Sequence, residues 1–460
     1  MAVERTRPVH IADLERARKC LEHRGPDAAN SMIGQIDVDR GRSYFGLAHT
    51  RLSIVDLDPR SNQPFEKDGA TIVFNGEIYN FREIREERLA EVRFRTDGDT
   101  EVLLEILRNE GIDGISRLMG QWAFAYHKEG SSGVVLGHDR FGKKPLFFLL
   151  NNDQFIVSST VTAITAYTRQ LIHFDRNFVR SFLRHPLTPL AGENTPYEEI
   201  KQLPAGHVAN FDVNRWTLDH KAIFQKAELP DVGLSEMDLA QRLSKAVERR
   251  LVSDRPIGLL LSGGVDSTLI LSILKAIGRL DEVSCFVGEA GNSADATFAL
   301  EAARAVGIEP TLINIDYDRN AFGDFLSVCA HQERPFRLLG NLIAMPQLYR
   351  AVSETPIKVV LDGTGADEMF GGYWDRYFPF AIRNAMASGN LLWLLGSAAA
   401  ARKDPRRWLS AARLAVRGHF DQLDPSLREA FGEDILEPKF DSYGSIFGVW
   451  LCPVRIKSMG

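Results

Sequence analysis

The sequence predicts an α+β domain followed by an α/β domain with a doubly wound parallel sheet. In the first half, short strand-type runs alternate with turn signals and helical patterns, which is typical of packed antiparallel sheets. From about residue 235 onward, apolar runs without alternation are followed by helical segments, as in a series of βαβ units. The chain has 460 residues, which at about 150 residues per domain allows two or three domains.

Strand-type runs recur through the first half. Tyr44–Ala48, Thr71–Phe74 and Gly133–Gly137 are short, mainly apolar, and bounded by turn residues. The pair Asn75-Gly76, directly after the second run, is typical of a turn. We therefore expect short antiparallel strands joined by tight turns.

Two helices are predicted in the same half, at Ile11–Glu22 and Asp99–Glu110. In the second helix, apolar residues recur at helical spacing: Val102, Leu103, Ile106 and Leu107. Asp97 or Asp99 could cap its start, with an acidic residue in its first turn.

The second half begins with an amphipathic helix at Ser235–Leu251, after a linker at Ala227–Ser235. The apolar run Ile257–Leu261 then predicts a strand buried on both faces, and a helix at Ser267–Ile277 follows a glycine-rich turn. Further short apolar strands are predicted at Ser284–Val287, Thr311–Ile315 and Lys358–Leu361. This order of elements predicts a doubly wound sheet.

Composition and charge exclude several classes of protein. The chain has 55 Lys and Arg against 61 Asp and Glu, a net charge of -6, which argues against a protein that coats nucleic acid or an anionic membrane. Its 4 cysteines form no CxxC pair, so a disulfide framework and a zinc site are not expected. No run resembles a membrane span or a secretory signal, and we expect a cytoplasmic protein.

The most informative segment is Leu261–Ser267, with the sequence Leu-Ser-Gly-Gly-Val-Asp-Ser after a predicted strand. Its glycines let backbone N–H groups approach an anion, the hydroxyls of Ser262 and Ser267 can donate to phosphate, and a helix N-terminus adds a favourable dipole. A carboxylate in a phosphate-binding site suggests that a cation is bound between the carboxylate and the phosphate, so we interpret Asp266 as a Mg²⁺ ligand. The alternative is a strand-to-helix turn without a ligand.

This loop resembles the SGG-x-DS pyrophosphate loop, or PP-loop, of the N-type ATP pyrophosphatases. Those enzymes cleave ATP to AMP and pyrophosphate while adenylating a carboxyl or carbonyl oxygen. A second acidic, glycine-rich segment, Leu361–Glu368, also follows an apolar strand. Because α/β sheets bind ligands at the carboxyl ends of their strands, we expect Asp266 and Asp367 to hold one Mg²⁺ ion against ATP.

Motifs in both halves together resemble the asparagine synthetase (glutamine-hydrolysing) family over about residues 8 to 375. In the first half these motifs are His23–Asp27, Arg51–Asp56, Gln63–Phe65, Phe74–Asn80, Asp97–Glu101 and Asp139–Leu146. The resemblance implies a four-layer N-terminal-nucleophile glutaminase domain, a class II glutamine amidotransferase, at residues 1–226. It implies an ATP-pyrophosphatase synthetase domain at residues 235–460 and a role in asparagine biosynthesis.

The resemblance also assigns site residues. The glutamine pocket would comprise Arg51, Asn75, Gly76, Glu77 and Asp99. ATP would contact Leu261, Ser262, Gly263, Gly264, Asp266, Ser267, Val287, Asp362 and Gly363, and Glu368 would be catalytic. Arg51 suits the α-carboxylate, Asp99 the α-ammonium, and Asn75 with the Gly76 amide an oxyanion hole.

The sequence departs from the family at its nucleophile. The family attacks glutamine with the thiol of a cysteine at the mature N-terminus, whose own α-amine serves as base, whereas residue 2 here is Ala2. Cys20 lies within a predicted helix, so we do not expect it to replace that cysteine. We expect the first strand of the domain, which carries this cysteine, to be missing. Either the start assigned to the sequence lies after that strand, or the glutaminase activity has been lost, and we expect the glutaminase half of the chain as it stands to be inactive.

Two further departures concern the synthetase half. Thr364 stands where the family often has a glutamate near the acyl-adenylate, so the acid need not be aspartate. Glu333 could supply a carboxylate instead, or form a surface salt bridge. The chain stops at Met459–Gly460, where family members continue with helices, so we expect a truncated synthetase domain.

Three functions stay open at this point. The first is an ATP-dependent ligase that adenylates aspartate or a related acid and transfers ammonia from glutamine. The second keeps the adenylation but uses free ammonia or an amine on the substrate itself, as in lactam-forming members without the cysteine. The third is a degenerate, non-catalytic relative. Dimerisation into a homodimer is implied by resemblance, and neither nucleic acid nor membrane is an expected partner.

Overall fold

The computed structural model describes residues 1–39, 41–184, 192–224, 235–291, 293–317, 321–333, 341–370, 374–401 and 405–417. Two compact units are present in these ranges. One contains described residues of 1–175 and 190–363, and the other those of 176–189 and 364–451. The predicted linker at Ala227–Ser235, apart from Ser235, and the chain end at Met459–Gly460 lie outside the described residues.

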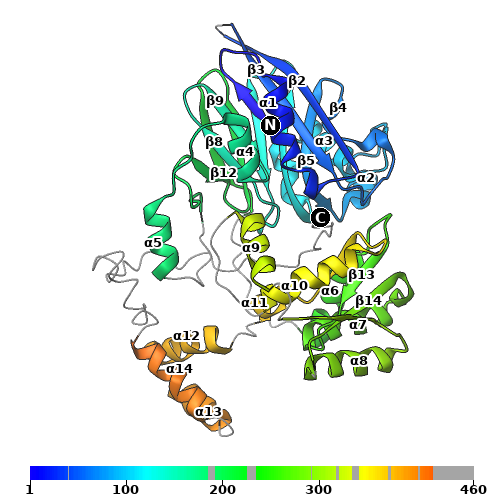
Figure 1. Ribbon diagram of the computed structural model, residues 1–460, viewed down its shortest axis with the longest axis vertical. Helices are drawn as coiled ribbons and strands as arrows, with labels where there is room; N and C mark the ends of the chain where they lie inside the picture. The colour runs from blue at the N-terminus through cyan, green and yellow to red at the C-terminus, as the bar shows by residue number, and fades with distance from the viewer. Residues whose placement is uncertain are drawn as a thin grey trace. The chain divides into compact units, whose positions relative to one another are not determined.

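Two six-stranded antiparallel sheets form the first half of the chain (Figure 1). Sheet A has the order β10-β8-β9-β1-β3-β2 and sheet B the order β12-β11-β7-β6-β5-β4. The strands of sheet A are β1 (Ala2–Glu4), β2 (Ala28–Val38), β3 (Gly41–Arg51), β8 (Phe147–Leu150), β9 (Gln154–Ser158) and β10 (Ile200–Gln202). Those of sheet B are β4 (Phe65–Lys67), β5 (Ala70–Ile78), β6 (Gly120–Lys128), β7 (Gly133–His138), β11 (His207–Asp212) and β12 (Thr217–Ala222).

Three clusters of buried apolar side chains show that the two sheets pack on each other and that helices cover their outer faces. One cluster joins Val3 and Leu47 of sheet A to Leu136 and Phe211 of sheet B, so the sheets pack face to face. On the outer face of sheet A lie α1 (Ile11–Lys19) and α4 (Val161–Thr168), which supply Leu14 and Ile164 to a second cluster. The four-layer arrangement expected for this half is therefore present.

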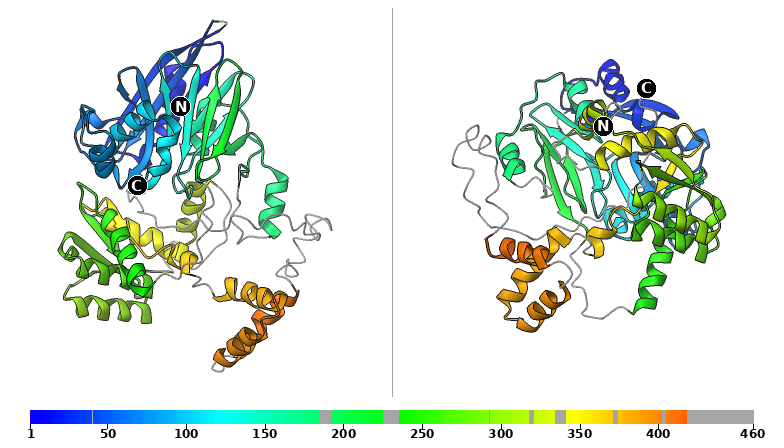
Figure 2. Two further views of the ribbon diagram at one scale, coloured as in Figure 1. Left: turned by 180° about the vertical axis from the view of Figure 1, so that it is seen from behind. Right: turned by 60° about the horizontal axis from the view of Figure 1, so that its bottom comes forward.

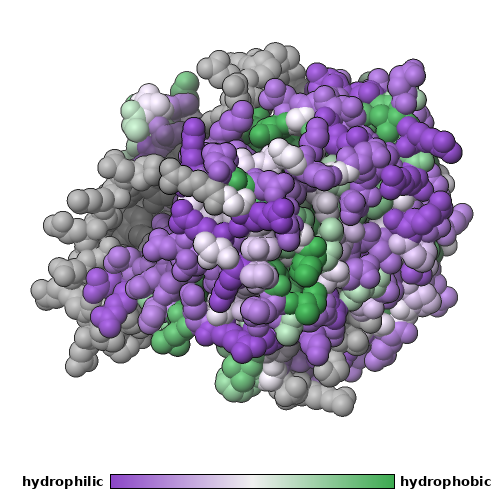
Figure 3. Space-filling model, turned by 90° about the horizontal axis from the view of Figure 1, so that it is seen from above, coloured by the Kyte–Doolittle hydropathy of each residue, from purple (hydrophilic) through white to green (hydrophobic). Residues whose placement is uncertain are grey.

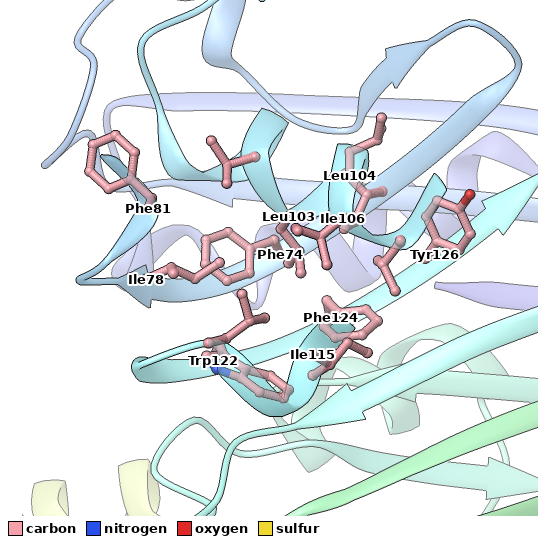
Figure 4. Packing of buried hydrophobic residues seen from close by; sticks show 14 of the residues in the cluster. Phe74, Ile78, Phe81, Leu103, Leu104, Ile106, Ile115, Trp122, Phe124 and Tyr126 are labelled. Atoms are coloured by element: carbon pink, nitrogen blue, oxygen red, sulfur yellow. The ribbon is translucent and has the colours of Figure 1, made fainter. Parts of the chain in front are cut away.

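The third cluster covers the outer face of sheet B. There α2 (Phe81–Arg88) and α3 (Asp99–Asn109) pack on strands β5 and β6. Figure 4 shows Phe74 and Phe124 of the sheet directed at Leu103 and Ile106 of α3. All of these side chains are at most 3% exposed, so α3 is anchored by a dry apolar contact. The predicted helix Asp99–Glu110 is confirmed to within one residue.

Two local expectations differ from the structure. The first strand was expected to be missing, but Ala2–Glu4 forms β1 in the interior of sheet A, with Val3 paired to Phe45 and Phe155. The turn predicted at Asn75-Gly76 is wrong, because both residues lie inside β5 and pair with β6. A Cβ on Gly76 would lie 2.1 Å from the carbonyl oxygen of Gln121, so the glycine permits close strand contact rather than a turn.

A four-stranded parallel sheet with the order β15-β14-β13-β16 forms the core of the second half. Its strands are β13 (Ile257–Leu260), β14 (Val283–Glu289), β15 (Thr311–Asn314) and β16 (Val359–Leu361). All four lie at the predicted places. The chain moves outward from β13 to β14 and β15 and then returns to β16 on the other side of β13, so the strand order reverses between β13 and β16. Ligands of open α/β sheets bind at such a point, beyond the carboxyl ends of the strands.

Helices cover both faces of this sheet, as the apolar strands predicted. On one face α7 (Val265–Ala276) and α8 (Ala294–Val306) pack with Leu259 and Val287. On the other face α10 (Asn341–Ser353) packs with Leu260 and Phe286. The helix α6 (Glu236–Arg249) precedes β13, and Ser235 caps it: the Ser235 hydroxyl accepts the Asp238 N–H, and the Asp238 carboxylate accepts from Ser235 in return.

The remaining helices are α5 (Arg176–Arg184), α9 (Ala321–Gln332), α11 (Ala366–Phe370), α12 (Trp374–Ala387), α13 (Leu391–Ala400) and α14 (Pro405–Arg417). The views of Figures 1 and 2 agree that α12, α13 and α14 lie side by side. Trp408 of α14 donates from Nε1 to the Ser397 hydroxyl of α13 at 3.1 Å, and Phe378 of α12 contacts Trp393.

Within the described ranges, no helix has both the length and the apolar character that crossing a bilayer requires. The face of the molecule seen in Figure 3 is mostly hydrophilic, with smaller apolar areas between.

Candidate active site

The predicted glutamine-pocket residues converge at one end of the layer between sheets A and B. Side chains along a strand alternate between its faces. Arg51 therefore shares the inner face of β3 with Leu47, whose side chain lies in the cluster between the sheets. Asn75 and Glu77 share the inner face of β5 with Val73, which packs on the same cluster.

Two buried amide groups at this place have no hydrogen-bond partner among the described residues. One is Nδ2 of Asn75, and the other is the whole side-chain amide of Gln121, which is 1% exposed and lies directly across from Glu77 in β6. Buried amides are rarely left unsatisfied unless a ligand or water completes them. An oxyanion hole needs N–H donors that are not already bonded, and within the described residues Nδ2 of Asn75 is such a donor beside the Gly76 amide.

Arg51 is held by the segment that follows it. The NH1 group donates to the Asp58 carbonyl at 3.1 Å and to Oδ1 of Asn62 at 2.9 Å. The NH2 group donates to the carbonyls of Val55, at 3.2 Å, and Asp56. The guanidinium therefore organises the 55–62 segment, in addition to the predicted role of binding a carboxylate.

Asp99 is the first residue of α3 and is 6% exposed. The capping role proposed for Asp97 or Asp99 is wrong: Gly98 occupies the N-cap position, and no side chain caps the helix. Instead, Oδ2 of Asp99 accepts the Ile78 N–H at 2.9 Å. Burial, assisted by the nearby Glu77 carboxylate and opposed by the Ile78 amide, raises the pKa of Asp99 to about 7.

Cys20 is not placed as a nucleophile. It follows α1, its thiol donates to the Arg16 carbonyl at 3.5 Å, and burial raises the pKa of that thiol. Reactive cysteines need the opposite shift. The first half has no other cysteine. The surroundings of Cys20 agree with the expectation that it does not replace the family's N-terminal cysteine.

In the second half, the predicted phosphate loop is ordered by its own serines. The Ser267 hydroxyl accepts the Ser262 N–H at 3.1 Å, lies 3.0 Å from the Ser262 hydroxyl and donates to the Gly264 carbonyl at 3.3 Å. Ser267 is 2% exposed, whereas Ser262 is exposed. Ser267 therefore holds the loop in shape, and Ser262 is the hydroxyl that a phosphate can reach.

Two glycines bring neighbouring backbone close to this loop. Gly263 has φ +78°, and a Cβ there would lie 2.1 Å from the carbonyl oxygen of Asp295 in α8. At the end of β16, a Cβ on Gly363 would lie 2.9 Å from Cβ of Asp266 and 3.0 Å from the Ser267 nitrogen. The loop after β13 and the segment after β16 therefore meet where the strand order reverses.

Leu261 and Val287 were expected to surround adenine. Each is 1% exposed, and both lie in the apolar cluster beneath α7 and α8. Their side chains are therefore part of the core, and only their backbone could face a base. Asp362, next to Gly363, is half-buried.

Ser267→Ala is expected to weaken ATP binding about tenfold, because the buried hydroxyl makes three of the contacts that shape the loop and each lost hydrogen bond costs about 1 kcal/mol. Calorimetric titration with Mg·ATP measures the change. Ser272→Ala is the matched control, because that hydroxyl is exposed on α7 and bonds only to Thr268 of the same helix. Equal affinities in both variants would contradict the assigned role of Ser267.

The comparisons with known proteins agree with this geometry. Residues 2–221 match the family described as glutamine amidotransferase domain, and residues 238–434 match the asparagine synthase family. The chain belongs to the asparagine synthetase family. Asparagine synthetase [glutamine-hydrolyzing] 1 of Bacillus subtilis is 29% identical over 380 residues, which cover 80% of this chain and 57% of the relative.

Other relatives carry different names. "Amidase chry2" of Gibberella zeae is 26% identical and "Amidase chyE" of Penicillium rubens is 28% identical, each over 79% of this chain. The chain spans about half the length of these two relatives, 55% in each case. Among solved structures, a glutamine phosphoribosylpyrophosphate amidotransferase from B. subtilis is 14% identical, with a TM-score of 0.35, over 72% of this chain and 79% of that chain.

The residues predicted to hold Mg²⁺ in this asparagine synthetase family member are carboxylates. Asp266 is half-buried in the first turn of α7, and Asp367 is half-buried in α11 with the predicted catalytic Glu368. The described residues contain no group of three side chains that could hold a metal by themselves.

Glu333 does not supply the carboxylate that Thr364 lacks. Its side chain accepts the backbone N–H groups of Val161, at 2.6 Å, and Thr162, at 2.8 Å, at the start of α4. The carboxylate satisfies two free donors of a helix N-terminus and complements its dipole. This residue of the synthase half therefore caps a helix of the amidotransferase half, and Thr364 is exposed.

Sequence reasoning missed three contributors to the amidotransferase site. Gln121 faces the pocket from β6, Asn62 accepts from Arg51, and Nε2 of His49 lies 3.1 Å from the Phe74 carbonyl, across the two sheets. The buried position of Gln121 depends on the pairing of β5 with β6, which no local sequence spacing shows. Asn62 directly precedes the predicted motif Gln63–Phe65, so among the three residues it is the one that a motif search could have found.

Proposed function

We propose that this chain forms amide bonds with ATP as the energy source. A carboxylate oxygen of aspartate or a related acid attacks the α-phosphorus of ATP, and the bond to the β-phosphate oxygen breaks, which releases pyrophosphate. Ammonia or an amine then attacks the acyl-adenylate carbonyl and loses a proton, and AMP leaves. The meeting of the phosphate loop with the end of β16 at Gly363 is the observation that carries this proposal.

The chain's own groups suit these steps. The N–H groups of Gly263 and Gly264 and the N-terminus of α7 bind the β- and γ-phosphates, and Ser262 donates to them. Asp266 and Asp367 would hold Mg²⁺, which neutralises phosphate charge when it is bound. Glu368 is assigned a catalytic role, Asp362 and Gly363 contact the nucleotide, and the backbone of Leu261 and Val287 faces adenine.

In the amidotransferase half we propose a glutamine pocket of Arg51, Asn75, Gly76, Glu77 and Asp99. Nδ2 of Asn75, which has no partner among the described residues, and the Gly76 N–H stabilise an oxyanion. Because Cys20 is not placed as a nucleophile, we propose that these residues bind glutamine without hydrolysing it. Ammonia or a substrate amine then supplies the nitrogen. We further propose a cytoplasmic enzyme that acts as a homodimer on small molecules.

Pyrophosphate release from Mg·ATP tests this function. Aspartate and a panel of carboxylic acids are each supplied with glutamine, with ammonium or with neither. We expect release with ammonium and not with glutamine, and the responding acid identifies the substrate. Release without any nitrogen source, once ATP hydrolysis without acid is subtracted, would instead indicate internal ring closure to a lactam. No release and no ATP binding would leave a non-catalytic relative and contradict the proposal.

A further inference from the structure

One segment of the chain contributes to both halves of the molecule. Arg51 faces the predicted glutamine pocket, but Leu52 and Ile54, 6% and 3% exposed, lie in the apolar cluster of the synthase half. That cluster also contains Leu259 of β13 and Leu261, the residue before the phosphate loop. The segment that follows Arg51 and the strand that leads into the phosphate loop therefore share one close-packed core. Because such a core has little free volume, a displacement of the segment also displaces the strand.

Asp254 and Arg255, which are separated from β13 only by Pro256, hold the same segment by its backbone. The Asp254 N–H donates to the Ile54 carbonyl at 2.9 Å, and Oδ2 of Asp254 accepts the Asp56 N–H at 2.7 Å. Nε of Arg255 donates to the Ser53 carbonyl at 3.1 Å. Each of the three residues Ser53, Ile54 and Asp56 thus has a backbone group fixed by the synthase half.

Binding at Arg51 must disturb this segment. The two terminal nitrogens of Arg51 already donate to Asn62 and to the carbonyls of Val55, Asp56 and Asp58. Only its Nε–H has no partner among the described residues. A carboxylate clamped by two parallel N–H groups needs one of the terminal donors as well. Glutamine must therefore displace or share at least one contact that holds the segment.

We propose that Asp254 and Arg255 are positioning residues that couple glutamine binding to ATP binding through the segment Arg51–Asp56. The inference rests on the proposed function, because it takes glutamine and ATP as the two ligands. Glutamine changes the contacts of the segment, Asp254 and Arg255 pass the change to β13, and β13 ends at the phosphate loop. Such coupling is reciprocal, so each ligand changes the dissociation constant of the other by the same factor.

Titration calorimetry on the full chain tests the coupling. The Kd of glutamine is measured with and without saturating Mg·ATP, and the Kd of Mg·ATP with and without saturating glutamine. We expect both constants to change by the same factor, at least about fivefold. Asp254→Ala, which removes the acceptor for the Asp56 N–H, is expected to reduce the factor to less than about twofold. Asp254→Asn keeps an acceptor oxygen and is expected to retain the coupling.

Two further variants separate positioning from general loosening. Arg255→Ala removes the contact with Ser53 and should also reduce the factor, which keeps the test open if Asp254→Ala fails to fold. Glu333→Ala cuts a different contact between the same two halves, at the start of α4. It is expected to leave the factor unchanged, and a loss of coupling there equal to that in Asp254→Ala would overturn the positioning role.

The possible failures are distinguishable. If glutamine or Mg·ATP does not bind the unmodified chain when offered alone, the proposed function fails and the inference with it. If both bind and their dissociation constants are independent, only the inference is overturned.

Discussion

Gly263→Ala is expected to lower the affinity for ATP at least about a hundredfold, a change of about 3 kcal/mol. Gly263 has φ +78°, a conformation that costs an alanine about 1–2 kcal/mol. The added methyl would lie 2.1 Å from the Asp295 carbonyl oxygen, and overpacking adds about 1–3 kcal/mol. The neighbour is backbone in the first turn of α8, so it cannot rotate away, and the loop must open instead.

Calorimetric titration with Mg·ATP measures this effect, with a thermal melt to show that the variant is folded. Gly264→Ala is the matched control in the same loop. Gly264 has φ −74°, which alanine adopts without strain, and its Cβ would meet only the Ser262 hydroxyl, at 3.3 Å. We expect a loss of less than about tenfold there. A folded Gly263→Ala protein that binds ATP within threefold of the unmodified chain would show that ATP binds elsewhere.

The phosphate loop illustrates which features sequence can predict. The strand before the loop and the helix after it can be predicted from residues that are adjacent in the sequence: an apolar run, then glycines, then a helix start. The structure has β13 and α7 at these predicted places. The parallel sheet was predictable for the same reason, because strands buried on both faces need no alternation. The strand order, and hence the approach of Gly363 to Asp266, comes only from the fold.

Asn75-Gly76 shows where local reasoning fails. The pair is a strong turn signal by itself, but β6 continues alongside β5 and pairs with both residues. Tertiary pairing therefore overrides the local preference. The same pairing buries Gln121, whose role no spacing could reveal. Glu333 is a third case, since its partners, Val161 and Thr162, belong to the other half of the chain.

Glutamine binding is expected to weaken about tenfold between pH 8 and pH 6. The α-ammonium of glutamine needs Asp99 as a carboxylate, and burial raises the pKa of Asp99 to about 7. Protonation of Asp99 therefore competes with the ligand below pH 7, and affinity rises with pH through this value and levels off above it. An exposed carboxylate would show no change in this range, because its pKa lies near 4.

Asp99→Asn tests the assignment without removing the contact that shapes the site. Its amide oxygen can still accept the Ile78 N–H, which Oδ2 of Asp99 accepts at 2.9 Å, so we expect a folded protein. Affinity for glutamine should fall at least about a hundredfold at pH 8, because an ammonium group loses its buried counter-charge. The residual binding should no longer depend on pH. Asp97→Asn is the control, since that side chain is 89% exposed beside Arg85.

The combination of the two results decides the role of Asp99. A pH dependence that persists in Asp99→Asn would assign the titration to a group other than Asp99. A flat profile with unchanged affinity would mean that the α-ammonium does not reach Asp99. If the Asp99 carboxylate binds the α-ammonium of glutamine, Asp99→Asn binds glutamine weakly and without dependence on pH. Asp97→Asn then binds glutamine as the unmodified chain does.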